Sequence, residues 1–282
     1  WDVDGNDNDG QAWYTLSVAA SPIDPYQVVV GGVNIWRSDD GGVNWQINAH
    51  WYGANGTPYV HADIHDLVFK PGSGSVLYSG CDGGVFQTTN IGASWDDISG
   101  NMGIAQIYRM GLSASTSDLL ITGHQDNGTN RMNSTGFERV IGGDGMDCFI
   151  DWSDDNTMYG ELYYGAFNRS DDGGQNWSGI TNGLTGNAGW VTPWTQDPVD
   201  PNTIYAGYTQ IFKSVDKGDN WTQLGTAPSG STLIDILVAP SDNKVIVAAT
   251  PYNLVKTSDG GLTWTNITAG LPTSQAQITR VA

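Results

Sequence analysis

One eight-residue motif recurs along this chain at a nearly constant spacing. Its consensus is Ser/Thr-x-Asp-x-Gly-x-Asn/Thr/Ser-Trp. The five copies, here called the boxed turns, are Ser38–Trp45, Thr88–Trp95, Ser170–Trp177, Ser214–Trp221 and Thr257–Trp264. Phe137 stands where a sixth tryptophan is expected, so the repeats step by 40 to 50 residues. A period of this length indicates one supersecondary unit, repeated six times along nearly the whole chain.

Each repeat contains four short strand patterns. A first apolar segment ends near a proline, a second apolar segment follows, and a third alternating segment leads into the boxed turn and a fourth strand. Four antiparallel strands in about 40 to 45 residues are typical of a propeller blade. We therefore predict an all-β fold, a β-propeller of four-stranded antiparallel blades. The expected blades are approximately 11–50, 59–103, 104–143, 144–185, 188–226 and 230–271.

The ends of the chain have the pattern of incomplete blades. Residues 277–282 resemble the first strand of a further blade, and residues 1–3 resemble a fourth strand. A propeller closes by pairing its ends, because open strand edges are a liability. We expect residues 1–282 to form a single propeller domain that is a fragment of a longer chain, with seven or more blades and further domains in the complete protein.

Composition and charge agree with a β fold and exclude several functions. The chain has 38 glycines, only 15% charged residues and 11 Lys plus Arg, which disfavours helices. A net charge of −19 opposes binding to nucleic acid or to an anionic membrane surface. No apolar stretch is long enough for membrane insertion. Cys81 and Cys148 lack the spacing of a zinc site, so we expect buried, structural thiols.

The boxed turns have a physical rationale and a family resemblance. The aspartate can accept backbone N–H bonds, the glycine can take positive φ, and the tryptophan can pack between sheets. They resemble the Asp-box of the BNR-repeat and sortilin-type propellers, a group that includes sialidases and two-propeller endo-xyloglucanases. A structural role is expected for Asp40, Trp45, Trp95, Asp172, Trp177, Asp216, Trp221, Asp259 and Trp264.

Polar and aromatic residues gather on the blade face opposite the boxed turns. In a blade, the loops between strands two and three, and those leading to the next blade, share one face. Rings that stack on sugars and carboxylates that bind hydroxyls are typical of carbohydrate sites. The expected ligand-binding residues are His61, Asp63, His65, His124, Gln125, Asn127, Tyr163, Tyr164, Trp190 and Tyr208.

A second resemblance concerns the short motifs on this face. His61–Asp66, Asp82-Gly83-Gly84, Gln125–Gly128 and Gly143-Asp144-Gly145 resemble motifs of secreted bacterial proteins labelled glycosyl hydrolases, which carry a C-terminal sorting domain. Asp82 is similar to a catalytic aspartate of the xyloglucanase family. The resemblance implies candidate catalytic acids at Asp82, Asp126, Asp144 and Glu161. The alternative is that these residues satisfy turns and buried backbone groups.

The opening acidic run has the character of a calcium loop. Asp2, Asp4, Asp7 and Asp9 alternate with asparagine and glycine, which supplies the oxygen ligands and the tight turn that Ca²⁺ prefers. A solvated acidic linker is the alternative, and no other cofactor is expected.

Three functions stay open. The first is an extracellular or cell-surface recognition scaffold that binds a polysaccharide or an extracellular protein. The second is a glycoside hydrolase with a paired-carboxylate mechanism, and the third is a purely structural assembly component. Sialidase chemistry is disfavoured, because the arginines lie mostly on third strands rather than around one site.

Overall fold

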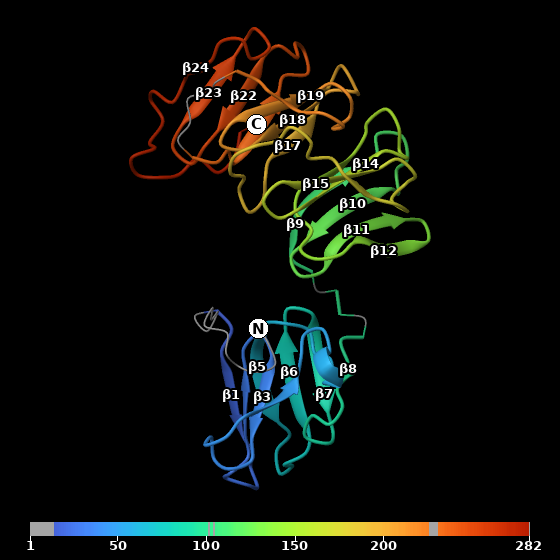
Figure 1. Ribbon diagram of the computed structural model, residues 1–282, viewed down its shortest axis with the longest axis vertical. Helices are drawn as coiled ribbons and strands as arrows, with labels where there is room; N and C mark the ends of the chain where they lie inside the picture. The colour runs from blue at the N-terminus through green and yellow to red at the C-terminus, as the bar shows by residue number, and fades with distance from the viewer. Residues whose placement is uncertain (1–13, 101, 104, 226–230, 282) are drawn as a thin grey trace. The chain divides into compact units, whose positions relative to one another are not determined.

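The computed structural model describes residues 14–100, 102–103, 105–225 and 231–281. In these ranges the fold consists of six four-stranded antiparallel sheets and one short 3-10 helix, η1 (Ala54–Gly56). The strands of every sheet follow one another in chain order, which is the topology of a propeller blade. This confirms the predicted fold class. The chain divides into two compact units, unit 1 (Trp1–Ile104) and unit 2 (Ala105–Ala282), which are coloured blue to teal and green to red in Figure 1.

Unit 1 contains two sheets. The strands of the first are β1 (Ser17–Ala20), β2 (Val28–Gly31), β3 (Ile35–Ser38) and β4 (Gln46–Ala49). The strands of the second are β5 (Ile64–Phe69), β6 (Leu77–Cys81), β7 (Gly84–Thr88) and β8 (Asp96–Asp97). The first strands, β1 and β5, pack against each other, and the buried side chains of Val29, Ile64, Leu77 and Phe86 belong to one apolar core.

Unit 2 contains four sheets. The strands of the first are β9 (Ile107–Leu112), β10 (Leu120–His124), β11 (Gly128–Asn133) and β12 (Gly136–Ile141). The strands of the second are β13 (Cys148–Ile150), β14 (Met158–Leu162), β15 (Ala166–Ser170) and β16 (Ser178–Gly179). The strands of the third are β17 (Trp194–Gln196), β18 (Ile204–Gly207), β19 (Ile211–Ser214) and β20 (Thr222–Gln223). The strands of the fourth are β21 (Asp235–Val238), β22 (Ile246–Ala249), β23 (Leu254–Thr257) and β24 (Thr265–Asn266). Strand β9 packs on β13, and β17 packs on β21.

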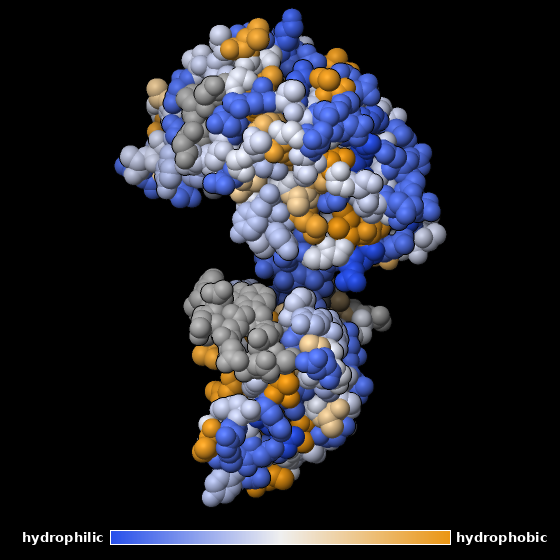
Figure 2. Space-filling view, viewed as in Figure 1, coloured by the Kyte–Doolittle hydropathy of each residue, from blue (hydrophilic) through white to orange (hydrophobic). Residues whose placement is uncertain are grey.

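Aromatic side chains fill much of the core between the sheets of unit 2. Phe167 of β15 stacks on Trp194 of β17 with ring centroids 4.1 Å apart, and Tyr159 of β14 contacts the same tryptophan edge-on. Burying rings of this size contributes roughly 1.5 to 3 kcal/mol each. Figure 2 shows apolar side chains scattered among hydrophilic ones on the visible surface of each unit.

The boxed turns share one hydrogen-bond pattern. In Ser38–Trp45, the Ser38 hydroxyl donates to Asp40 Oδ1 at 2.8 Å and accepts the Gly42 N–H at 2.8 Å. Asp40 Oδ1 also accepts the Asn44 N–H at 2.8 Å. The glycine has a φ of 93°, a conformation that L-residues rarely adopt. The other turns repeat this arrangement, with Asn90 in the place of the aspartate in Thr88–Trp95.

The boxed tryptophans differ in burial. Trp221 is buried and its Nε1 donates to the Ile180 carbonyl oxygen at 2.6 Å. Trp45 is 42% exposed, and its Nε1 donates within its own turn, to the Gly42 carbonyl oxygen. The boxed tryptophan is therefore enclosed in the core at Trp221 and only partly covered at Trp45.

Two other segments differ from the repeat pattern. Phe137 is the second residue of β12, the fourth strand of its sheet, close to where the repeat predicts it. A tight hairpin between Asn133 and Gly136 replaces the boxed turn, and the Phe137 ring is exposed. Residues 277–281, expected to start a further blade, form no strand in the described part of the chain. The Ile278 N–H instead donates to the Pro251 carbonyl oxygen.

Candidate functional site

Three exposed aromatic rings form one surface in unit 2, here called the aromatic platform. Tyr163 and Tyr164 lie in the turn between β14 and β15, and Trp190 lies in the segment that precedes β17. The Tyr163 and Trp190 rings are parallel within 2°, with centroids 5.3 Å apart. The Tyr164 ring lies edge-on to Trp190, also at 5.3 Å. The three side chains are 43%, 59% and 38% exposed, so part of each ring is open to solvent.

The turn that carries the two tyrosines has an unusual backbone. Leu162 pairs with Ala166, and within the turn Tyr164 has a φ of 59°. Positive φ at a bulky residue is uncommon and persists only where the surroundings enforce it. Here the Tyr164 N–H donates to the Trp190 carbonyl oxygen at 3.3 Å. The backbone bond therefore joins the two segments of the platform.

Two linked side-chain hydrogen bonds connect the platform to Tyr108 of β9. Trp190 Nε1 donates to the Tyr108 hydroxyl at 3.0 Å, and this hydroxyl donates to Gln125 Oε1 at 2.5 Å. His124 pairs with Ile107 and Gly123 pairs with Arg109, so Tyr108 is the extra residue of a β-bulge. The bulge directs its side chain to the β10–β11 turn. Sequence analysis missed Tyr108, because a bulge depends on the register with a distant strand.

The expected acids and amides near the β10–β11 turn lie beside these hydrogen bonds. Asp144 Oδ1 accepts the Asp126 N–H at 2.7 Å, and the Asn127 side chain donates to the Gln125 carbonyl oxygen at 3.1 Å. Asp126 has a φ of 59°. All four residues are half-buried. The turn is thus held by its own amide groups and by Asp144 of the β12–β13 segment, and both carboxylates remain within reach of solvent.

Three of the residues expected to face a ligand are buried. Tyr208 is 6% exposed and its hydroxyl donates to the Gly165 carbonyl oxygen at 2.8 Å. His124 is also buried, with Nε2 2.7 Å from the Thr122 hydroxyl oxygen, and burial lowers its pKa. Glu161 is fully buried. In the described structure none of the three offers an open surface, which corrects the expected placement.

Glu161 and Asp147 form a pair of carboxyl groups with perturbed pKa values. Burial raises the pKa of Glu161 to about 8, although backbone and side-chain bonds from Gly165 and Thr192 oppose the shift. Burial likewise raises the pKa of the half-buried Asp147 to about 7, against the opposing charge of Arg109. The Asp147 N–H lies 3.3 Å from Glu161 Oε2.

Unit 1 gathers a second group of expected site residues. His65 Nε2 lies 2.6 Å from Asp82 Oδ1, at the turn between β6 and β7. His65 is the extra residue of a bulge in β5, and the Tyr14 ring contacts its imidazole edge-on. His61 packs on Gly83, where a Cβ would lie only 2.2 Å from the imidazole. The glycine after Asp82 is therefore needed for close packing.

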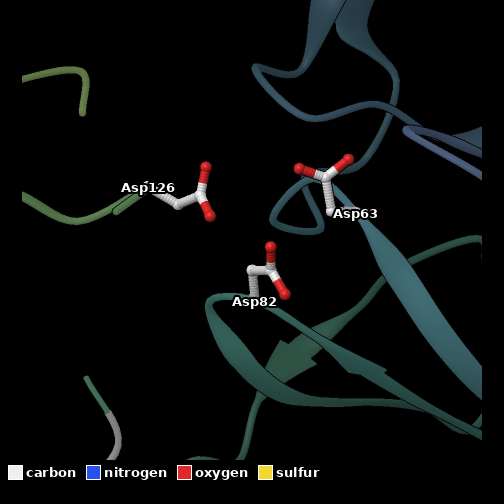
Figure 3. A group of neighbouring side chains, drawn as sticks. All are labelled: Asp63, Asp82 and Asp126. Carbon is white, nitrogen blue, oxygen red and sulfur yellow. The ribbon is translucent and has the colours of Figure 1, made fainter. Parts of the chain in front are cut away.

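Asp63 completes this group. It precedes β5, is buried and has a φ of 64°. One carboxylate oxygen of Asp63 lies within 4.8 Å of one of Asp82, and Figure 3 shows the two side chains next to each other. Retaining glycosidases use carboxyl groups about 5 to 5.5 Å apart. Two carboxylates also supply part of the six to eight oxygens that Ca²⁺ takes.

The remaining expectations fall in different places. Asp82 belongs to unit 1, whereas Asp126, Asp144 and Glu161 belong to unit 2. The expected calcium ligands Asp2, Asp4, Asp7 and Asp9 lie outside the described residues.

Comparison with known proteins gives one sequence relative and several structural ones. No family model matches the chain. A xyloglucanase from Paenibacillus sp. is 28% identical over 141 residues, which cover 42% of this chain and 14% of that protein. The chain thus matches about a seventh of the length of this curated relative.

Three solved structures match most of the chain. The GH74 xyloglucanase of Xanthomonas campestris has a TM-score of 0.46 at 16% identity, covering 91% of this chain and 45% of its own. YCF48 from Cyanidioschyzon merolae has a TM-score of 0.42 at 13% identity, covering 89% and 84%. The extracellular domain of a putative one component system from B. thetaiotaomicron has a TM-score of 0.47 at 17% identity, covering 90% and 33%.

Among the residues that the structure describes, no helix has the length and hydropathy needed to cross a bilayer.

Proposed function

We propose that this chain binds a neutral polysaccharide on the aromatic platform of unit 2. The observation that carries the proposal is the parallel pair of exposed rings, Tyr163 and Trp190, with Tyr164 edge-on beside them. Sugar rings present apolar C–H faces that stack on such rings, and nearby amides and carboxylates accept the hydroxyl bonds. A net charge of −19 disfavours an anionic glycan.

Two further observations support the choice of ligand class. The 141-residue segment is similar in sequence to a xyloglucanase, and the boxed turns resemble the Asp-box of carbohydrate-active propellers. A polysaccharide of this kind is extracellular, so the proposal places the chain outside the cell or on its surface. A protein partner on the same face is the competing outcome.

Binding of xyloglucan, measured by affinity electrophoresis and calorimetry, tests the proposal. Trp190→Ala and Tyr163→Ala should each weaken binding about tenfold, equivalent to about 1.4 kcal/mol. Trp152→Ala is the matched control, because Trp152 is also exposed in unit 2 but bonds to Asp197 away from the platform. Absence of binding to xyloglucan and to other neutral glucans, or an equal loss in the control, would reject the proposal.

Glycoside hydrolysis in unit 1 is a second candidate, favoured by the proximity of Asp63 and Asp82. His65 holds Asp82 by a hydrogen bond, so Asp82 is the better placed nucleophile or base, and the buried Asp63 is the shielded acid. Asp82→Asn should abolish release of reducing sugar while the xyloglucan affinity of unit 2 is unchanged. If the wild-type protein releases no reducing sugar from any bound glucan, this candidate is rejected.

A further inference from the structure

Both loops of the aromatic platform are attached to a single buried side chain, Glu161. Its Oε1 accepts the Gly165 N–H at 3.0 Å and the Thr192 N–H at 2.9 Å. Its Oε2 accepts the Thr192 N–H at 3.1 Å. Gly165 closes the turn that carries Tyr163 and Tyr164, and Thr192 follows Trp190 by two residues. The carboxyl group therefore holds the backbone of the platform from inside.

These contacts explain why a carboxyl group is buried here, where its desolvation costs free energy. The chain has only two glutamates, the exposed Glu138 and the fully buried Glu161. Buried N–H groups need acceptors, and the N–H groups of Gly165 and Thr192 both find theirs in Glu161. We propose that Glu161 is the positioning residue of the aromatic platform, because its carboxyl oxygens hold the backbone of both loops.

A third backbone group meets the same carboxyl. The Asp147 N–H donates to Glu161 Oε2 at 3.3 Å from the β12–β13 segment. Three backbone N–H groups, those of Asp147, Gly165 and Thr192, therefore converge on the two carboxyl oxygens.

A side chain without an acceptor at this position would leave buried N–H groups of both loops unsatisfied. The platform would then lose the backbone contacts that fix the positions of its rings.

Hydrogen exchange measured on the intact chain tests the inference without a ligand. The readout is the protection of residues 161–166 and 188–193, corrected for intrinsic rates. Glu161→Leu lacks both acceptor oxygens, so the protection of these residues should fall about tenfold or more relative to the wild type. Glu161→Gln keeps one acceptor oxygen and places an NH2 group where the other oxygen stood, so its protection should fall by about threefold.

The control is Glu138→Gln, which should behave as the wild type because Glu138 is exposed. Full protection in Glu161→Leu would overturn the positioning role. If Glu161→Leu fails to fold, Glu161→Gln decides, and protection equal to that of the wild type would overturn the role. The measurement of ligand affinity rests on the proposed function. Xyloglucan affinity should fall about tenfold in Glu161→Leu and should not change in the control. Lack of xyloglucan binding by the wild type, with the exchange pattern as expected, rejects the proposed function and leaves the positioning role intact.

Discussion

Arg169 Nη1 donates to the carbonyl oxygen of Lys217 at 2.7 Å, across two neighbouring sheets of unit 2. Arg169 ends a third strand, and Lys217 precedes the glycine of the next boxed turn. The same contact joins Arg37 to the Ile91 carbonyl oxygen in unit 1 and Arg131 to the Gly173 carbonyl oxygen in unit 2. A boxed turn therefore anchors the preceding sheet as well as closing its own hairpin.

Removing this contact should destabilise unit 2. Arg169→Ala loses the bond to Lys217 and the ion pairs with Asp171 and Asp219. We expect the free energy of unfolding, measured by urea denaturation, to fall by about 1.5 to 3 kcal/mol. Lys213→Ala is the matched control, because Lys213 occupies the same position in the next sheet but lies over the Tyr205 ring. Equal losses in the two variants would contradict the role given to the arginine.

Gly92→Ala should strongly destabilise unit 1. A Cβ at Gly92 would lie 1.9 Å from Asn48 Oδ1, and the residue has a φ of 88°. Asn48 bonds to the Ile91 carbonyl oxygen and has little freedom to move. The expected loss is about 2 to 4 kcal/mol in thermal or urea denaturation. Gly32→Ala, with negative φ and its nearest contact at 4.0 Å, should stay within about 0.5 kcal/mol, and a similar loss there would contradict the steric explanation.

Stability should pass through a maximum in mildly acidic solution. Glu161 and Asp147 have raised pKa values of about 8 and about 7. The folded protein therefore binds protons that the unfolded chain releases above about pH 4, and the free energy of unfolding falls as pH rises toward 8. The slope should reach about 1.4 kcal/mol per pH unit for each group.

At acidic pH the free energy of unfolding changes with pH in the opposite direction. Hydrogen bonds from Asn176 lower the pKa of Asp172 in its boxed turn to about 2, so its stabilisation is lost as the pH falls through that value. Urea denaturation between about pH 2 and pH 9 measures both limbs. Glu161→Gln should remove about half of the slope above pH 4, because Asp147 still contributes, and should leave the slope on the acid side unchanged. An unchanged alkaline limb in this variant would show that other groups cause it.

Tyr108→Phe should weaken the platform without unfolding it. The change removes the hydroxyl that accepts from Trp190 Nε1 and donates to Gln125. We expect a three- to tenfold lower affinity for xyloglucan, about 0.7 to 1.4 kcal/mol, with a thermal midpoint close to that of the wild type. Tyr252→Phe, an exposed tyrosine of the last sheet, should not change the affinity. Unaltered binding in Tyr108→Phe would mean that Trp190 is positioned by its backbone alone.

The fold was predictable because its signals are local. The boxed turns are closed by side chains two and four residues away, as in Ser38, Asp40 and Asn44, and such contacts leave a motif in the sequence. Strand patterns between the turns then place the sheets. Phe137 shows the limit, because the repeat phase found its strand position but a two-residue hairpin turned its ring to solvent.

The site was predictable only in part. The loops that carry Tyr163, Trp190 and Asp82 were expected on one blade face, and the structure shows which rings are exposed. Burial of Glu161 and Tyr208 was not visible in the sequence, because it depends on how the loops from three sheets fold over each other. Long-range packing decides these positions, and one sequence records little of it.

The bulges in β5 and β9 occupy the same place in two sheets. In one, the extra residue His65 meets Asp82 of the turn that follows, and in the other, Tyr108 meets Gln125. An imidazole–carboxylate pair and a phenol–amide pair thus occupy equivalent positions on the same backbone arrangement. Because neither pair contributes to the strand ladder, this position is a natural grafting point at which new chemistry can be installed while the sheet is left unchanged.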